Sequence, residues 1–254
     1  MPKLFCISDV HGFYDEMIEA LNEAGFDPSD ESHWLISCGD TLDRGKQPRQ
    51  VMNYLMGLQR KILVRGNHED LIMDCITREY PYDNDWHNGT AQTIIDLAPN
   101  TNMFEEACTT IYPKMKKFVN NMVNYFETKN YIFVHSFVPL NSNSVLPPYF
   151  LKGKNYTKME NWREANSLQW EDARWGNPFE LAEQGLLPNK ILVFGHWHCS
   201  AGWSKMEELS EFGHDAKFDP FYGDGFIGID ACVAHSGKVN VIVLDDEFME
   251  SDVS

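Results

Sequence analysis

The sequence is poor in positive charge and has no long apolar run. Its 254 residues carry 21 Lys and Arg against 38 Asp and Glu, giving a formal net charge of −17. A groove lined with basic side chains for nucleic acid is therefore not expected. No apolar stretch approaches the roughly 18 residues needed to cross a bilayer. The chain opens on residues 3–7, which have the character of a buried strand, so we expect neither a leader nor a membrane partner.

Cysteine pairs are also missing. The six cysteines are scattered without a Cys-x-x-Cys motif, at positions 6, 38, 75, 108, 199 and 232. This distribution argues against a disulfide framework and indicates free, buried thiols in a reducing compartment. We therefore expect a cytoplasmic protein.

The composition is typical of a globular protein, with 43% hydrophobic, 13% aromatic and 23% charged residues. Short apolar runs with the character of strands recur at 4–8, 34–38, 61–64, 131–134, 190–194, 226–229 and 239–244. Between the early runs, apolar residues follow helical spacing around Met17, Val51 and Leu71. This alternation predicts an α/β fold with helices packed on sheets.

No internal repeat or long linker divides the chain, so we expect a single domain over residues 1–254. Residues 81–128 have a mostly helical pattern and are expected to form a cap or insertion. Residues 137–189, rich in Asn, Pro and Trp, are expected to be irregular.

Polar side chains follow five of the predicted strands at the point where each strand ends. They occur in the segments Asp9-Val10-His11, Gly39-Asp40-Thr41-Leu42-Asp43-Arg44, Gly66-Asn67-His68-Glu69, His135, and Gly195-His196-Trp197-His198. In an open α/β sheet, ligand sites assemble at strand ends. Oxygen and imidazole donors without thiolates suit Mn, Fe, Zn or Mg rather than a structural Cys-zinc site.

Each fragment alone has a simpler interpretation. Asp9 or Asp40 could cap a turn or helix, and His135 could be a core histidine. The ordered set of five makes coincidence a poor explanation, and the glycines would let the backbone turn sharply beside a crowded centre.

As a set, these motifs resemble the calcineurin-like metallophosphoesterases, over nearly the whole chain. The forms GDTLDRG and RGNHE are similar to the phosphoprotein-phosphatase branch. That branch includes the bacteriophage-lambda and bacterial serine/threonine phosphatases and the symmetrical diadenosine tetraphosphatases. The resemblance implies a four-layer α/β/β/α sandwich with a helical insertion.

The resemblance also implies a binuclear centre of two divalent metal ions, Mn being the first choice and Fe, Zn or Mg the alternatives. Asp9, His11 and Asp40 would hold the first ion. Asp40 would bridge to the second, whose other ligands would be Asn67, His135 and His196. Hydroxide held between the ions would attack phosphorus in line.

The same resemblance assigns catalytic roles. His68 would be the general acid, and Asp43 would orient it. Arg44 and Arg174, together with Asn67, would bind the phosphate. For Arg174, a surface residue in an acidic stretch is the alternative.

One departure bears on the substrate. Phosphoprotein phosphatases generally lack a histidine at the position of His198, whereas broader metallophosphoesterases use it as a ligand of the first metal. The resemblance therefore implies that His198 completes the coordination of the first metal, the alternative being a residue that only neighbours the ligands. We expect hydrolysis of phosphomonoesters, including phosphoserine or phosphothreonine. The alternatives are a dinucleoside polyphosphate hydrolase or phosphodiesterase, and a metal-binding scaffold without activity.

Overall fold

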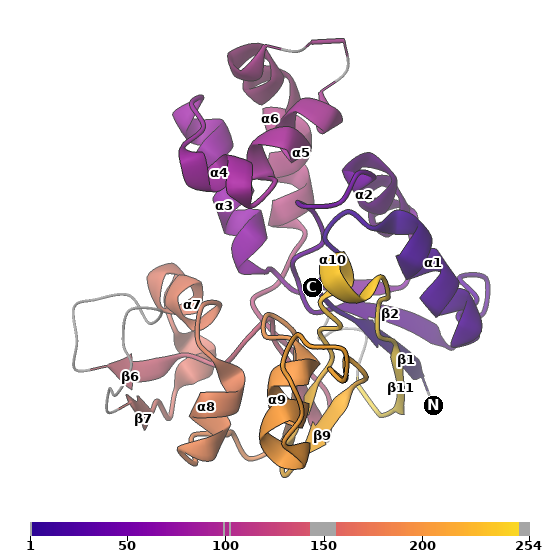
Figure 1. Ribbon diagram of the computed structural model, residues 1–254, viewed down its shortest axis with the longest axis vertical. Coiled ribbons are helices and arrows are strands. Elements are labelled where there is room, and N and C mark those ends of the chain that lie inside the picture. Colours follow the sequence, from indigo (N-terminus) through magenta and orange to yellow (C-terminus); the bar gives the residue numbers. More distant parts are fainter. Residues whose placement is uncertain (1, 99, 102, 143–155, 249–254) are drawn as a thin grey trace.

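Two β-sheets form the centre of the computed structural model, which describes residues 2–98, 100–101, 103–142 and 156–248 (Figure 1). The first sheet has the strand order β11 (Ile242–Asp245), β1 (Lys3–Ile7), β2 (His33–Ser37) and β3 (Lys61–Leu63). The second has the order β4 (Phe126–Glu127), β5 (Tyr131–Phe133), β8 (Ile191–Phe194), β10 (Phe226–Gly228) and β9 (Phe221–Gly223). Strands β1, β2 and β3 are mutually parallel, as are β5, β8 and β10.

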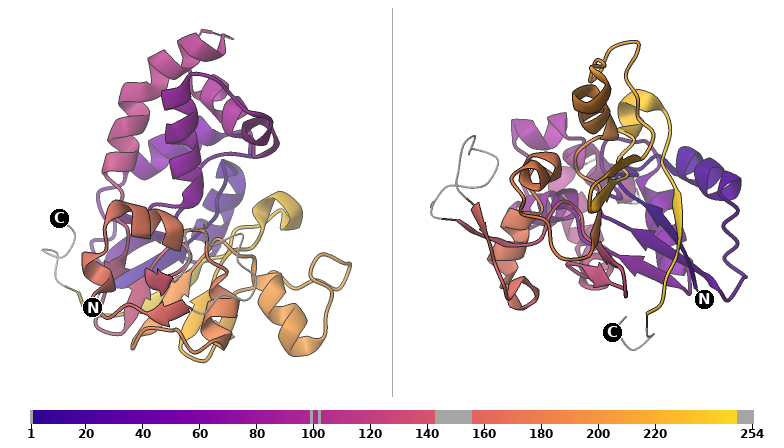
Figure 2. Two further views of the ribbon diagram at one scale, coloured as in Figure 1. Left: turned by 90° about the vertical axis from the view of Figure 1, so that its left-hand side faces the viewer. Right: turned by 90° about the horizontal axis from the view of Figure 1, so that it is seen from below.

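Helices cover the outer face of each sheet (Figure 2). Those on the side of the first sheet are α1 (Tyr14–Glu23), α2 (Pro48–Gly57), α3 (Asn67–Arg78), α5 (Thr90–Leu97) and α6 (Phe104–Asn120). Those on the side of the second sheet are α7 (Ser167–Ala173), α8 (Pro178–Glu183) and α9 (Cys199–Glu207). The short elements are α4 (Asp83–His87), the 3₁₀ turn η2 (Trp162–Glu164), α10 (Val233–Ser236) and the hairpin of β6 (Leu140–Ser142) and β7 (Tyr156–Lys158).

Alternation along the strands builds three hydrophobic layers. In β1, Phe5 and Ile7 pack against the helices, whereas Leu4 and Cys6 pack between the sheets. Successive side chains of a strand point to opposite faces, so a strand buried on both sides is apolar throughout. The sheets therefore lie face to face with helices outside, and the expected four-layer α/β/β/α sandwich is confirmed.

All seven predicted strands are present, as β1, β2, β3, β5, β8, β10 and β11. The expectation of irregular structure over 137–189 is wrong in part, because β6, β7, α7 and α8 lie there; residues 143–155 of that span are outside the described residues. Helices α4, α5 and α6 fill the predicted insertion and stand at the top of the molecule in Figure 1. Its role as a cap, and the single-domain interpretation, stay predictions. Among the described residues, no helix is both long and apolar enough to cross a membrane.

The layer between the sheets gives a stability prediction. Phe133 of β5 is fully buried there, so Phe133→Ala should lower the free energy of unfolding by about 3–5 kcal/mol. Tyr222→Ala, on β9 of the same sheet but 61% exposed, is the control and should change it by less than about 0.5 kcal/mol. Equal losses in urea denaturation would contradict this layer assignment.

Candidate metal centre and active site

The polar residues predicted from the sequence gather where the strands of both sheets end. Asp9 and Asp40 follow β1 and β2, and Asn67 opens α3 after β3. His135 and His196 follow β5 and β8 of the second sheet. Because these strands are parallel within each sheet, their carboxyl ends meet at one edge, which brings residues far apart in the sequence to one point.

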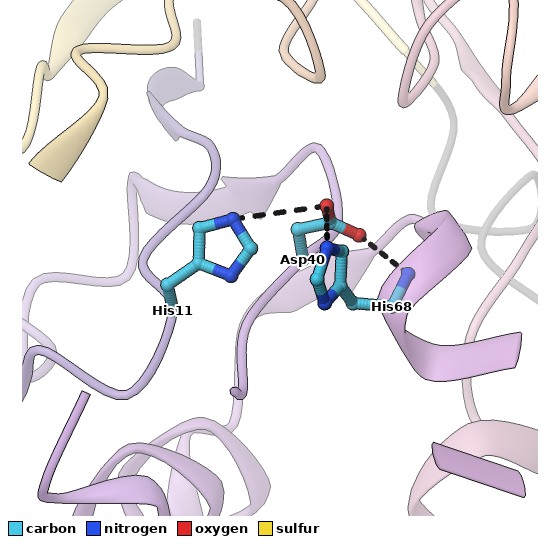
Figure 3. Close-up of side chains that lie close together, drawn as sticks. All are labelled: His11, Asp40 and His68. Carbon is cyan, nitrogen blue, oxygen red and sulfur yellow. Dashed lines mark hydrogen bonds and ion pairs between the residues drawn. The ribbon is translucent and has the colours of Figure 1, made fainter. Parts of the chain in front are cut away.

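The Asp40 carboxylate lies at the centre of this group. Its Oδ2 is 3.8 Å from Nε2 of His11 and 3.9 Å from Nε2 of His68, and its Oδ1 accepts a hydrogen bond from the backbone N–H of His68 (Figure 3). On the other side, Oδ1 is 3.4 Å from Nε2 of His135. Asp40 therefore belongs to both groups of potential metal ligands found in the described residues, His11–Asp40–His68 and Asp40–His135–His196.

The arrangement around His135 fits a cation. Its Nδ1–H donates to the carbonyl of Cys38 at 2.8 Å, which leaves the lone pair on Nε2. That lone pair faces Oδ1 of Asn67 at 2.7 Å and Oδ1 of Asp40 at 3.4 Å, and burial lowers the pKa of His135 well below its usual range. When the His135 ring is neutral, its Nε2 lone pair and the two oxygens face one another with no proton on the ring nitrogen between them. A positive ion at this point would relieve their repulsion.

His11 presents a similar donor set. Its Nδ1–H donates to the carbonyl of Leu42 at 3.0 Å, so Nε2 carries the lone pair. Nε2 faces Oδ1 of Asp9 at 3.9 Å as well as Asp40. The other oxygen of Asp9 accepts from the hydroxyl of Ser8 at 2.5 Å and from the backbone N–H of His196 at 2.8 Å. One carboxylate oxygen is thus anchored and the other is available to a cation.

The protein alone does not neutralise these carboxylates. Burial raises the pKa of Asp40 to about 7, and burial together with repulsion from Asp230 and Asp40 raises that of Asp9 well above its usual range. Buried carboxylates of this kind are stable as anions only beside a positive charge. Two divalent cations would supply that charge.

The backbone is strained where it delivers these side chains. Ten non-glycine residues in the described part of the chain have positive φ, and six of them belong to the site: Asp9, His11, Asp40, Asp43, Arg44 and His196. Such strain collects at functional sites, where the surrounding structure holds it in place. The site is also so crowded that position 195 requires glycine, because a Cβ there would collide with the carboxylate of Asp9 and the hydroxyl of Ser8.

The buried carboxylate of Glu69, for which the sequence indicated no role, joins two of these loops. The side chain of Glu69, fully buried, accepts hydrogen bonds from the backbone N–H groups of Asp40, Thr41 and Gly66 and from the Thr41 hydroxyl, at 2.8–3.0 Å. It therefore fixes the loop after β2 to the start of α3. The nearest sequence signal was its place in the Asn-His-Glu run.

His68, which also belongs to the first group of potential metal ligands, forms a dyad with Asp43. Nδ1–H of His68 donates to Oδ2 of Asp43 at 2.8 Å, and Nε2 lies 3.3 Å from Nη2 of the exposed Arg44. Burial lowers the pKa of His68, but the carboxylates of Asp40 and Asp43 outweigh it, so that this pKa is raised overall. The two carboxylates favour the protonated imidazole, whereas Arg44 can only donate to Nε2 and so favours the neutral ring. Nε2 can therefore donate a proton only when the hydrogen bond from Arg44 is given up.

Arg174 is nearly buried and already has partners. Its Nη1 donates to Asp70 at 2.7 Å and its Nη2 donates to Asn124 at 2.6 Å. Among the described residues its Nε has no hydrogen-bond partner. The next residue, Trp175, lies at the site, where its ring meets that of His196 edge-on with the centroids 6.1 Å apart.

The structure does not bring His198 into either ligand group. Its Nε2 is 3.2 Å from Oε1 of Glu211, its Nδ1 is 3.0 Å from the hydroxyl of Ser200, and its ring packs on Phe212. It is the N-cap residue of α9. Its role as a ligand of the first metal stays a prediction.

Comparison with known proteins agrees with this geometry. Residues 2–211 match the family model described as calcineurin-like phosphoesterase. A symmetrical bis(5'-nucleosyl)-tetraphosphatase of Klebsiella pneumoniae is 42% identical over 66 residues, and one of Salmonella newport is 39% identical over the same length. Each match covers 26% of this chain, which spans about a quarter (23%) of the length of these curated relatives.

Two solved structures share the fold. A crystal structure of a candidate diadenosine tetraphosphatase superposes with a TM-score of 0.53 at 13% identity, covering 97% of each chain. A cold-active protein-tyrosine phosphatase of a psychrophilic Shewanella species superposes with a TM-score of 0.55 at 15% identity, covering 96% of this chain and 76% of that one.

The fold and the clustered side chains able to hold metal ions are those of the phosphoesterase class. Enzymes of this class use a binuclear centre of divalent metal ions, and residues able to hold such ions are present. The chain belongs to the calcineurin-like phosphoesterase family.

Glu69 gives a prediction that separates support from ligation. Glu69→Gln places an amide N–H₂ against groups that donate, so the free energy of unfolding should fall by about 1–3 kcal/mol. The Mn²⁺ affinity measured by calorimetry should fall by about 10–100-fold, although Glu69 is not a proposed ligand. Glu19→Gln on the exposed face of α1 is the control. Unchanged metal affinity in Glu69→Gln would show that the loops hold their places without this carboxylate.

Proposed function

We propose that this protein is a binuclear-metal-dependent phosphatase that hydrolyses phosphomonoesters, including phosphoserine or phosphothreonine. The observation that carries the proposal is the His68–Asp43 dyad, with Nε2 of His68 3.9 Å from Asp40 and 3.3 Å from the guanidinium of Arg44. A proton donor, a guanidinium able to bind phosphate and a group of potential metal ligands thus lie next to one another. These are the groups needed to expel an alkoxide from a phosphate ester.

In this proposal Asp9, His11 and Asp40 hold one ion, and Asp40, Asn67, His135 and His196 hold the other. When bound, the ions, proposed to be Mn²⁺, supply Lewis-acid stabilisation of the phosphate oxygens and a nucleophile at neutral pH. The carbonyls of Leu42 and Cys38 fix the rings of His11 and His135 so that Nε2 of each points inward.

His68 donates the proton on Nε2 to the leaving-group oxygen, while Asp43 stabilises the imidazolium from Nδ1. The exposed Arg44 extends the positive charge of the site toward the solvent, where an incoming phosphate would meet it. Arg174 can join only through Nε or by exchanging Asp70 or Asn124 for the phosphate. Its role as a phosphate ligand stays a prediction.

A second candidate is hydrolysis of dinucleoside polyphosphates. The curated relatives named symmetrical bis(5'-nucleosyl)-tetraphosphatases support it. The half-buried indoles of Trp175 and Trp197, each 6.1 Å from the ring of His196, could stack on a base. Phosphodiester hydrolysis would be favoured by His198 as a metal ligand, and the contacts of His198 with Glu211 and Ser200 do not support that role. The inactive-scaffold alternative is disfavoured by the intact dyad.

Turnover on a panel with added Mn²⁺ tests the proposal. The panel holds an aryl phosphomonoester, the corresponding diester, a phosphothreonine peptide and diadenosine tetraphosphate. Cleavage of monoester and peptide without the diester is the expected result. Preference for the dinucleotide would favour the second candidate, and absence of turnover with both ions bound would favour the scaffold.

The bridging role of Asp40 predicts a change in metal content. Asp40→Asn keeps an oxygen for the backbone N–H of His68 but removes the charge shared by both ligand groups, so the two Mn²⁺ per chain should fall to one or fewer. Asp83→Asn, on exposed α4, should keep two. Elemental analysis after desalting measures this, and two ions at full occupancy in Asp40→Asn would refute bridging.

The acid role of His68 predicts separate effects on binding and turnover. His68→Ala should retain both ions while lowering kcat on an alkyl phosphomonoester by about 10²–10⁴-fold. The control is His87→Ala, because His87 is exposed and its Nδ1–H donates to a backbone carbonyl on α4. Wild-type activity in His68→Ala would mean that another group protonates the leaving oxygen.

A further inference from the structure

One side chain from the helical insertion reaches the dyad. The hydroxyl of Thr90, the first residue of α5, donates to Oδ2 of Asp43 at 2.5 Å across 47 positions of sequence. Both side chains are fully buried. The acceptor is the same oxygen that receives Nδ1–H of His68.

This hydroxyl is the second anchor of the Asp43 carboxylate. The other oxygen, Oδ1, is buried and has no hydrogen-bond partner among the described residues. Oδ2 of Asp43 thus accepts two hydrogen bonds, one from His68 on α3 and one from Thr90 on α5. Together the two donors restrict the orientation of the carboxylate. With only the imidazole as donor, the carboxylate and the ring could rotate together, and Nε2 would lose its fixed direction.

The contact is built into the backbone. Gly89 precedes Thr90 with φ of +80°, and a Cβ at Gly89 would lie 2.5 Å from the backbone nitrogen of Arg44. Only glycine allows the start of α5 to lie this close to the loop that carries Asp43 and Arg44. The insertion thus packs directly on the backbone of the proposed phosphate-binding residue.

We infer that Thr90 is a positioning residue that orients the Asp43–His68 dyad, so that the helical insertion aligns the general acid. The inference rests on the proposed function of His68. It predicts an effect concentrated on substrates that need a proton at the leaving oxygen: an alkoxide needs it, whereas p-nitrophenolate leaves readily without it.

The test compares Thr90→Val, which removes only the hydroxyl, with Thr90→Ser, which keeps it. Thr93→Val is the matched control, since Thr93 is buried one turn along the same helix. Thr90→Val should lower kcat on an alkyl phosphomonoester about tenfold or more, with KM within about twofold and kcat on p-nitrophenyl phosphate within about threefold. Thr90→Ser should restore most of the loss, and Thr93→Val should behave as wild type. In the His68→Ala background, Thr90→Val should have no further effect.

Equal losses on both substrates, or a further loss in the His68→Ala background, would overturn the positioning role. A readout independent of activity is the NMR signal of the His68 Nδ1 proton, assigned by its disappearance in His68→Ala. Thr90→Val should shift or broaden this signal, and Thr90→Ser should preserve it. A signal that does not respond to Thr90→Val overturns the inference. A response in a protein that hydrolyses no phosphoester would retain the inference and overturn the proposed function.

Discussion

The organisation of the molecule depends on one electrostatic constraint, the convergence of buried anions and lone pairs on Asp40. Carboxylate, amide and imidazole acceptors from both sheets lie within hydrogen-bond or ion-pair distance there, without protons to separate them. Burial raises the pKa values of Asp9 and Asp40 because it removes their carboxylates from water, and repulsion from Asp230 and Asp40 raises that of Asp9 further. Divalent cations would stabilise such a centre, so we expect metal binding to be coupled to the stability of the local fold.

The rest of the structure holds this centre in place. The two sheets bring their parallel strand ends to one edge, and the layer between them fixes their separation. Glu69 ties the loop after β2 to α3, and Gly195 allows the end of β8 to approach Asp9. Positive φ angles at Asp9, His11, Asp40 and His196 place these residues in a sparsely populated backbone conformation that the surrounding structure holds. The dyad then extends the centre toward solvent, where Arg44 lies.

Much of this could be predicted from sequence, since strand alternation and the residues after each strand are local patterns. The seven strands, α3 and the gathering of Asp40, His135 and His196 were predicted in this way. Contacts that depend on tertiary packing were not. Thr90 of the insertion hydrogen-bonds Asp43, which lies 47 positions earlier in the sequence. No local sequence pattern predicts that contact. The partners of Arg174 and His198 depend on where Asp70 and Glu211 come to lie.

We propose that the acceptors around Asp40 form a binuclear metal site. Anomalous diffraction from crystals of the Mn²⁺-loaded protein, recorded on both sides of the Mn absorption edge, would locate the ions. We expect two peaks flanking the Asp40 carboxylate, one beside Asp9 and His11 and the other beside Asn67, His135 and His196. A single peak, or peaks away from Asp40, would contradict it.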